Sequence, residues 1–152
     1  MPTGWRITKA ARAATAFEGE GARLYGGRWN SPGTALVYTA ESQSLAALEL
    51  LVHLQASQLL TSYCSISATF DGELIEVIDR AALPRQWRRF PAPVELQEIG
   101  DRWAAARRSV VLEVPSAVVP AERLFLLNPS HSDFASVAIG SPVPFELDPR
   151  LK

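Results

Sequence analysis

Four polar residues of this sequence stand where a packed core would favour apolar side chains. They are Arg28, Tyr38, Glu49 and Ser116. A carboxylate beside apolar neighbours is unfavourable unless it is paired or functional, so Glu49, on the flank of an apolar stripe, is the clearest of the four signals. Spacing alone favours the plainer interpretation, an Arg28–Glu49 ion pair inside the fold with Tyr38 as an ordinary half-buried aromatic residue.

The same residue types also suit the cleavage of an N-glycosidic bond. A guanidinium binds phosphate or pyrophosphate in a fixed fork, and an aromatic ring offers a platform for a flat cationic heterocycle such as nicotinamide. A carboxylate can bind a ribose hydroxyl and stabilise the positive charge of an oxocarbenium-like transition state. Nicotinamide is already cationic when it is bonded to ribose, so its departure needs no general acid and one carboxylate can suffice.

Composition narrows the class of protein. The chain has 152 residues, 47% hydrophobic and 20% charged, which predicts a single globular domain over residues 1–152 and excludes a disordered chain. A net charge of −1 argues against a protein that coats nucleic acid, and we expect no direct nucleic-acid binding. No run approaches the ~18–20 apolar residues that span a bilayer, and the N-terminus lacks a signal-peptide pattern. We therefore expect a cytoplasmic protein without membrane contact.

Metal, thiol and phosphate-loop chemistry find little support in the sequence. Cys64 is the single cysteine, and the two histidines, His53 and His131, lie far apart, so we expect no metal site. Cys64 is predicted to be a small buried apolar residue, and His131 to stabilise its loop rather than transfer protons. Neither a P-loop nor a Rossmann glycine pattern occurs.

Short apolar runs between prolines and glycines predict many strands. The expected strands are residues 5–7, 35–39, 63–70, 73–78, 109–114, 124–127 and 145–147. Ser42 is predicted to cap a helix that runs to about residue 54, and a second helix is predicted from residue 94 to about 107. The fold class is therefore α+β, with a small, mostly antiparallel sheet and two to four helices.

Glycines and turn pairs predict the connections that position the four polar residues. Residues 17–27 hold four glycines and are predicted to form a loop. A hairpin is expected next, with Arg28 on one arm and Tyr38 on the other. The Asp71-Gly72 pair predicts a second hairpin, which returns residues 73–78 onto residues 63–70.

A basic stretch offers a different function. Residues 80–108 contain seven arginines together with Trp87 and Trp103, and few acids. Arginines interleaved with aromatic rings can bind RNA phosphates or an acidic protein, which makes a non-catalytic binding module an alternative. Such a stretch is more often a solvated surface with its tryptophans turned inward, and we favour that interpretation.

Beyond these patterns, the chain resembles the RES-domain family, which is named for an Arg, a Glu and a Ser. The segments that carry the resemblance are residues 21–33, 37–42, 45–49, 109–116 and 127–131. The family Arg and Glu match Arg28 and Glu49. The family Ser matches Ser116, with Ser130 as the other candidate.

The resemblance implies a fold like that of the ADP-ribosyltransferase toxins, with a small split β-sheet and a central NAD cleft. It implies a bacterial toxin that cleaves the nicotinamide–ribose bond of NAD by hydrolysis or phosphorolysis, or that transfers ADP-ribose to a protein. It further implies an Xre-type antitoxin that covers the cleft, and a homodimer within a larger complex. Whether water, phosphate or a protein accepts the ADP-ribosyl group stays open.

By the same resemblance, Arg28 would bind the NAD phosphates and Tyr38 would line the nicotinamide site. Glu49 would carry the transition-state charge and contact the ribose, and Ser116 would orient NAD. The residues expected to be catalytic are Glu49, Arg28 and Tyr38, and those expected to bind NAD are Arg28, Tyr38, Ser116, Trp29 and Asn128.

Overall fold

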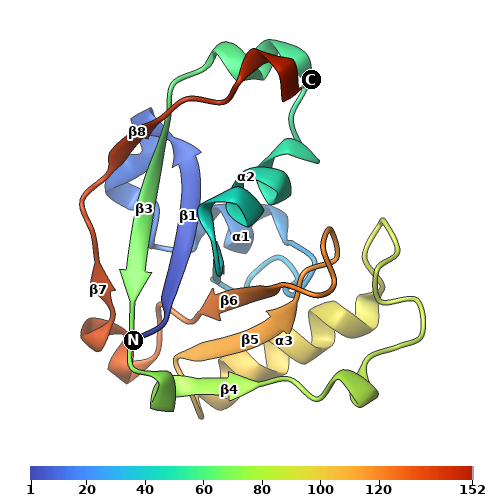
Figure 1. The fold of residues 1–152 in the computed structure, drawn as a ribbon. Helices are drawn as coiled ribbons and strands as arrows, with labels where there is room; N and C mark the ends of the chain where they lie inside the picture. The colour runs from blue at the N-terminus through green and yellow to red at the C-terminus, as the bar shows by residue number, and fades with distance from the viewer. Residues whose placement is uncertain (152) are drawn as a thin grey trace.

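One curled β-sheet organises residues 1–151, the part of the chain that the computed structural model describes (Figure 1). Its strands are β1 (Thr3–Lys9), β2 (Val37–Ala40), β3 (Tyr63–Thr69), β4 (Ile75–Val77), β5 (Val111–Pro115), β6 (Arg123–Leu127), β7 (Ala138–Ile139) and β8 (Val143–Phe145). Their order is β4-β5-β6-β2-β1-β3-β7, and β8 also pairs with β3. All these pairs are antiparallel except β4–β5, which is parallel. The predicted α+β class with a mostly antiparallel sheet is confirmed.

The sheet splits where β1 meets β2. These two strands share the single register pair Trp5–Ala40, whereas β1 pairs with β3 along its whole length. On the other side of the split, β2 pairs along its length with β6. Figure 1 shows β1 and β3 running nearly upright while β4, β5 and β6 cross the view, with α2 in the angle between the two halves. The split sheet that the resemblance implied is therefore present.

Three α-helices accompany this sheet in the described residues: α1 (Glu20–Tyr25), α2 (Gln43–Leu51) and α3 (Val94–Ala106). Ser42 caps α2 as predicted, because its Oγ accepts a hydrogen bond from the Leu45 N–H at 3.1 Å. Helix α3 ends where Arg107 adopts a left-handed conformation with φ of 54°. Nowhere in residues 1–151 is a helix long and apolar enough to span a lipid bilayer.

Two of the predicted connections are wrong near Arg28. Residues 17–27 are not a continuous loop, because α1 lies inside them between Gly19 and Gly26, which both have positive φ. Arg28 is not in a strand either. It lies in a tight turn in which the Gly27 N–H donates to the Asn30 carbonyl oxygen at 2.9 Å. Only the Tyr38 arm of the expected hairpin is a strand.

The second predicted hairpin is also wrong, because β4 does not return onto β3. Asp71 accepts a hydrogen bond from the Glu73 N–H at 2.9 Å and starts a short 3₁₀ turn, Gly72–Leu74, in place of a two-residue hairpin turn. The chain then crosses to the far edge of the sheet, where β4 pairs with β5. The edge of β3 that was assigned to residues 73–78 is taken by β7 and β8.

The core holds the elements together on both faces of the sheet. Leu45 of α2 and Leu96 of α3 are fully buried in one cluster, together with Trp29 from the turn after α1. Cys64 lies in the second cluster, among the side chains of β3 and its neighbours, and is buried as predicted.

Helix α3 packs against the turn that carries Arg28 at one point of very close approach. A Cβ atom at Gly100 would overlap the carbonyl oxygen of Trp29, so only glycine fits there. This approach lets two polar side chains of α3 hold the turn. Gln97 Nε2 donates to the Gly27 carbonyl oxygen at 3.1 Å, and Asp101 Oδ1 accepts from the Ser31 N–H at 3.0 Å.

We predict that Gly100→Ala destabilises the protein by about 1–3 kcal/mol, because the atom that its Cβ meets is main chain and cannot move aside cheaply. Urea unfolding followed by circular dichroism measures this change. Gly21→Ala in α1 is the matched control, because its Cβ would meet nothing within 4 Å and alanine favours a helix. Equal stability of Gly100→Ala and the wild type would contradict the close approach.

Candidate active site

Ser116 and Glu49 make the shortest contact among the predicted site residues. Ser116 Oγ donates to Glu49 Oε1 at 2.6 Å, which joins α2 to the residue that follows β5. The same Oγ accepts hydrogen bonds from the N–H groups of Val118 and Val119, at 3.1 and 3.0 Å. Both acceptor positions of the hydroxyl are thus occupied, so its proton is directed at Glu49. Oε1 is fixed, while Oε2 has no hydrogen-bond partner among residues 1–151.

Arg28 is oriented by the main chain of a distant loop. Its Nη1 donates to the carbonyl oxygens of Trp87 and Arg89, at 2.9 and 2.8 Å. Nε and Nη2 have no hydrogen-bond partner within the described part of the chain. Partial burial lowers the pKa of Arg28, and the charge of Glu49 opposes this effect by raising the pKa. The charge of Glu49 therefore acts on the Arg28 guanidinium.

The Arg28–Glu49 ion pair that spacing favoured does not form. Across residues 1–151, neither the guanidinium nor the carboxylate takes part in an ion pair. Each is held by other groups, Arg28 by carbonyls and Glu49 by Ser116. Among the described residues, the two separately anchored charges keep unused hydrogen-bonding positions, Nε and Nη2 on Arg28 and Oε2 on Glu49, which suit a ligand that carries both an anionic group and a hydroxyl.

Tyr38 uses both hydrogen-bonding functions of its hydroxyl within the protein. It donates to Asn30 Oδ1 at 2.7 Å and accepts from the Trp29 N–H at 2.9 Å. The amide of Asn30 donates in turn to the Ala22 and Thr34 carbonyl oxygens, at 2.8 and 3.0 Å. Burial raises the pKa of Tyr38 above its ordinary value, so the phenol stays neutral. The hydroxyl of Tyr38 is thus used within the protein, and its partly buried ring packs on the core.

Glycine at position 27 makes this arrangement of Tyr38 possible. A Cβ atom there would lie 2.7 Å from Tyr38 Oη and 3.0 Å from Asn30 Oδ1. Because Gly27 has no side chain, the phenol of Tyr38 can lie directly against the backbone of the turn. Sequence reasoning predicted a glycine-rich loop over residues 17–27 but did not identify Tyr38 as the group that approaches Gly27.

Trp29 does not present its side chain to this cluster. The indole is 0% exposed and lies in the core, so its contribution here is the main-chain N–H that binds Tyr38. A contact between Trp29 and NAD stays a prediction.

Asn128 lies at the other end of the strands from Ser116. In the β5–β6 pair Val111 faces Leu127, which precedes Asn128, whereas Pro115 precedes Ser116 and faces Arg123. The Asn128 amide donates to the Ala104 carbonyl oxygen at 3.0 Å, and its Oδ1 accepts from the Ser130 N–H at 3.0 Å. The structure does not bring Asn128 to the cluster of Arg28 and Glu49.

Ser130 lies in the same loop as Asn128 and is exposed. The geometry therefore favours Ser116, which touches Glu49, as the family serine. In this loop His131 Nε2 bonds the Arg107 carbonyl oxygen at 2.9 Å, and Nδ1 accepts from the Asp133 N–H at 2.9 Å. The prediction that His131 stabilises its loop is confirmed.

The residues that sequence reasoning missed support the site from α3 and from the turn. They are Asn30, Gln97, Gly100 and Asp101. The position of Asn30 inside the matched segment 21–33 was a usable signal for it. The α3 residues gave no signal, because their partners lie about 70 positions away in the chain.

The basic stretch is built differently from a nucleic-acid platform. Trp103 is buried and Trp87 half-buried, and both pack on the core, so the expected inward orientation of the tryptophans is confirmed. Arg80 donates to the Pro120 carbonyl oxygen at 3.0 Å, and Arg88 donates to that of Ala117 at 3.0 Å. These arginines tie the stretch to the segment that follows Ser116.

Two hollows lie elsewhere in the molecule. One of about 650 Å³ is bounded by β4 and α3, and one of about 350 Å³ by the start of β3 and the residues around β8. Neither is lined by Arg28, Tyr38, Glu49 or Ser116. Within residues 1–151, no three His, Cys, Asp or Glu side chains are grouped to hold a metal ion.

Comparison with known proteins places these residues in a family. Residues 3–148 match the RES domain. "Toxin Res" of Yersinia enterocolitica is 40% identical over 149 residues, which cover 97% of this chain and 98% of that protein. "Prs ADP-ribosylating toxin" of Sphingobium sp. is 36% identical over 152 residues, which cover 97% and 94%.

A solved structure shares the fold. A chain of the M. tuberculosis MbcT–MbcA toxin–antitoxin complex superposes with a TM-score of 0.78 at 22% identity, covering 99% of this chain and 86% of that one. The family match and the two relatives extend over nearly the whole sequence and include the segments around Arg28, Glu49 and Ser116. The chain belongs to the RES domain family.

Proposed function

We propose that this protein is the toxin of a toxin–antitoxin pair and that it cleaves the nicotinamide–ribose bond of NAD. The observation that carries the proposal is the pair of opposite charges, Arg28 and Glu49, which are separately anchored and keep hydrogen-bonding positions free of any partner in residues 1–151. The names of the relatives support it, because two of them are a "Toxin Res" and an "ADP-ribosylating toxin".

Arg28 is suited to hold the pyrophosphate of NAD. Its Nη1 is fixed by two carbonyl oxygens, so the guanidinium plane is set before a ligand arrives. Nε and Nη2 can then bind two phosphate oxygens in a fork. The ring of Tyr38 would line the nicotinamide site, and its hydroxyl transfers no proton because Asn30 and Trp29 hold it.

Glu49 would contact the ribose next to the bond that breaks. As the C–N bond breaks, its electron pair goes to the pyridinium nitrogen, nicotinamide leaves neutral, and positive charge develops on the ribose carbon. The carboxylate stabilises this charge, and Oε2 can accept a hydrogen bond from a ribose hydroxyl. Phosphate, or a water molecule that releases its proton to solvent, then attacks the ribose carbon.

Ser116 would act through Glu49 rather than on NAD itself. Its proton is directed at Oε1, and its lone pairs are taken by two main-chain N–H groups. Ser116 is therefore a positioning residue that holds the carboxylate in one rotamer, and the orientation of NAD follows from Glu49 and Arg28.

A second candidate function is the transfer of ADP-ribose to a protein. The observation that favours it is the 36% identity to a protein named as an ADP-ribosylating toxin. Both functions break the same bond with the same residues, and they differ in the group that attacks the ribose carbon.

We also propose an antitoxin as the protein partner in the cytoplasm. The structural relative from M. tuberculosis is described in complex with an antitoxin, which supports this partner. That the antitoxin is of the Xre type, that it covers the site, and that the toxin is a homodimer remain predictions from the family resemblance.

Glu49→Gln is expected to lower NAD turnover by about 10²–10³-fold while NAD still binds, because the amide keeps the shape and the Ser116 contact but loses the negative charge. A proton NMR time course of NAD with and without phosphate measures the turnover and identifies the acceptor. Calorimetry with NAD checks binding, and expression of the wild type, but not of Glu49→Gln, should arrest growth. A full rate in Glu49→Gln would exclude charge stabilisation by this residue.

Ser116→Ala is expected to lower kcat at least about tenfold with little change in KM, because Glu49 loses the contact that fixes it. It should also destabilise the protein by about 1–3 kcal/mol, since two N–H groups lose their acceptor. Ser130→Ala, in the exposed loop, is the control and should change neither quantity. A raised KM at unchanged kcat in Ser116→Ala would show instead that Ser116 binds NAD directly.

Incubating the protein with cell lysate and NAD labelled in its adenylate half separates the two candidate functions. Transfer to a protein predicts a labelled band that is absent with Glu49→Gln. Label found in small molecules alone, with nicotinamide released, removes the transferase and leaves the NAD-cleaving enzyme.

A further inference from the structure

We propose that Phe90 is a stacking platform for the adenine base of NAD, so that the loop of residues 84–92 selects a dinucleotide over a mononucleotide. The inference rests on the proposed function, because it assigns the second half of the same substrate. It concerns a residue outside the four whose types first indicated the site.

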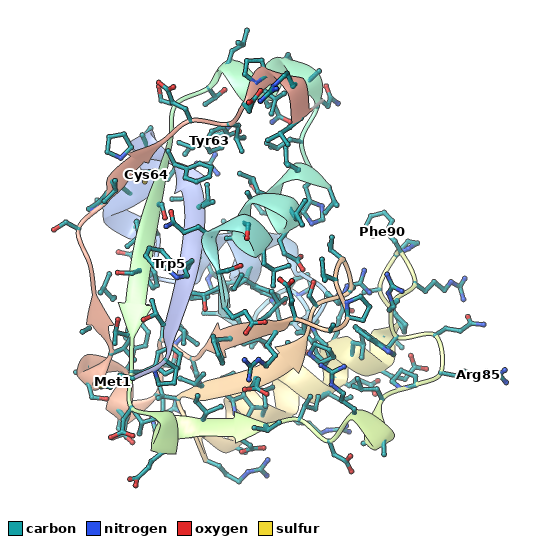
Figure 2. All side chains as sticks on the ribbon, in the orientation of Figure 1. Met1, Trp5, Tyr63, Cys64, Arg85 and Phe90 are labelled. Carbon is teal, nitrogen blue, oxygen red and sulfur yellow. The ribbon has the colours of Figure 1, made fainter. Side chains whose placement is uncertain are left out.

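Phe90 has a large aromatic side chain that is exposed to solvent, and it directly follows an anchored residue. Its side chain is 79% exposed, and Figure 2 shows it at the tip of the loop while Arg85 points away from the body of the molecule. Scattered exposed apolar residues are ordinary on protein surfaces, so exposure alone would carry nothing. What distinguishes Phe90 is the anchoring of the residues that come just before it.

The loop is tied to both sides of the site. Arg28 Nη1 binds the Trp87 and Arg89 carbonyl oxygens, so the peptide that leads into Phe90 is bonded to the proposed phosphate-binding side chain. Arg88 Nε donates to the carbonyl oxygen of Ala117, the residue after Ser116, at 3.0 Å. The Trp87 ring packs on the core beneath the loop. The backbone that leads into Phe90 is therefore held at Arg28, and the ring projects from it into solvent.

The position of Phe90 in the loop that Arg28 binds matters because NAD has a second nucleoside attached to its pyrophosphate. The pyrophosphate of NAD joins two nucleosides, so a pyrophosphate on Arg28 has the nicotinamide riboside on one side and adenosine on the other. Glu49 and Tyr38 are assigned to the nicotinamide riboside. The adenine base, one ribose away from the phosphate, then falls within the neighbourhood of the Arg28-bonded loop, where an aromatic face is exposed.

Stacking is the interaction that this residue can offer. A base on an aromatic side chain contributes about 1–3 kcal/mol and needs no specific hydrogen bonds, which fits an exposed ring at a loop tip. The exposed guanidinium of Arg89, the preceding residue, can add a cation–π contact with the base.

Kinetics with two substrates test the proposal. Phe90→Ala should raise KM for NAD about five- to hundredfold at unchanged kcat, and leave both constants for nicotinamide mononucleotide, which lacks adenosine, unchanged. Phe90→Trp should restore the NAD value. Leu60→Ala, which removes another exposed side chain far along the chain from the loop, should behave as the wild type. Equal effects of Phe90→Ala on the two substrates, or none on NAD, would overturn the platform.

Calorimetry with ADP-ribose tests the platform without any bond cleavage. Binding should weaken in Phe90→Ala, return in Phe90→Trp and persist in Glu49→Gln. If the wild type leaves NAD intact but binds ADP-ribose in this Phe90-dependent way, the proposed reaction fails and the platform stands. If Phe90→Ala binds ADP-ribose as tightly as the wild type, the platform fails whatever the reaction is.

Discussion

The site depends on the fact that Arg28 and Glu49 are kept from pairing with each other. The charge of Glu49 acts on the Arg28 guanidinium, so an ion pair between the two groups is the alternative arrangement. Main-chain carbonyls prevent this on one side, because they orient the guanidinium without neutralising its charge. A serine hydroxyl does the same for the carboxylate. Both groups therefore keep their charge for a ligand, in positions set before the ligand arrives.

The segments that carry Arg28 and Ser116 are in turn held in position by contacts with other elements of the fold. The Arg28 turn lies against α3 through Gly100, and Tyr38 enters it over Gly27. On the other side, the turn after β5 directs two N–H groups at the Ser116 hydroxyl, which leaves that hydroxyl only one direction for its proton. The split in the sheet places α2, and with it Glu49, in the angle between the two halves (Figure 1). A substitution at any of these supports would change the site without touching a ligand.

The sequence predicted the parts of this arrangement that rest on local patterns. The cap at Ser42 identified the helix that carries Glu49, and alternation identified β3. The apolar stripe expected from Leu45, Leu48 and Val52 is wrong in part, because Leu48 and Val52 are exposed. The route of β4 could not be predicted, because an Asp-Gly pair fits both a hairpin turn and the 3₁₀ turn that forms here. The supports from Gln97, Gly100 and Asp101 are contacts between distant segments, which periodicity does not record. The split of the sheet came from the family resemblance and not from any pattern in the residues.

The distribution of protons at the site limits the reaction that it can perform. The Tyr38 proton is bonded to Asn30, and the pKa of this phenol is raised, so it is a poor proton donor to a ligand. The Ser116 proton is bonded to Glu49. A leaving group that had to be protonated as it departs would find no donor in these two residues. The pyridinium of oxidised NAD departs as a neutral molecule without one, whereas the dihydropyridine of NADH would leave as an anion. Under the proposed function, the same contacts that fix the geometry favour the oxidised dinucleotide as the substrate.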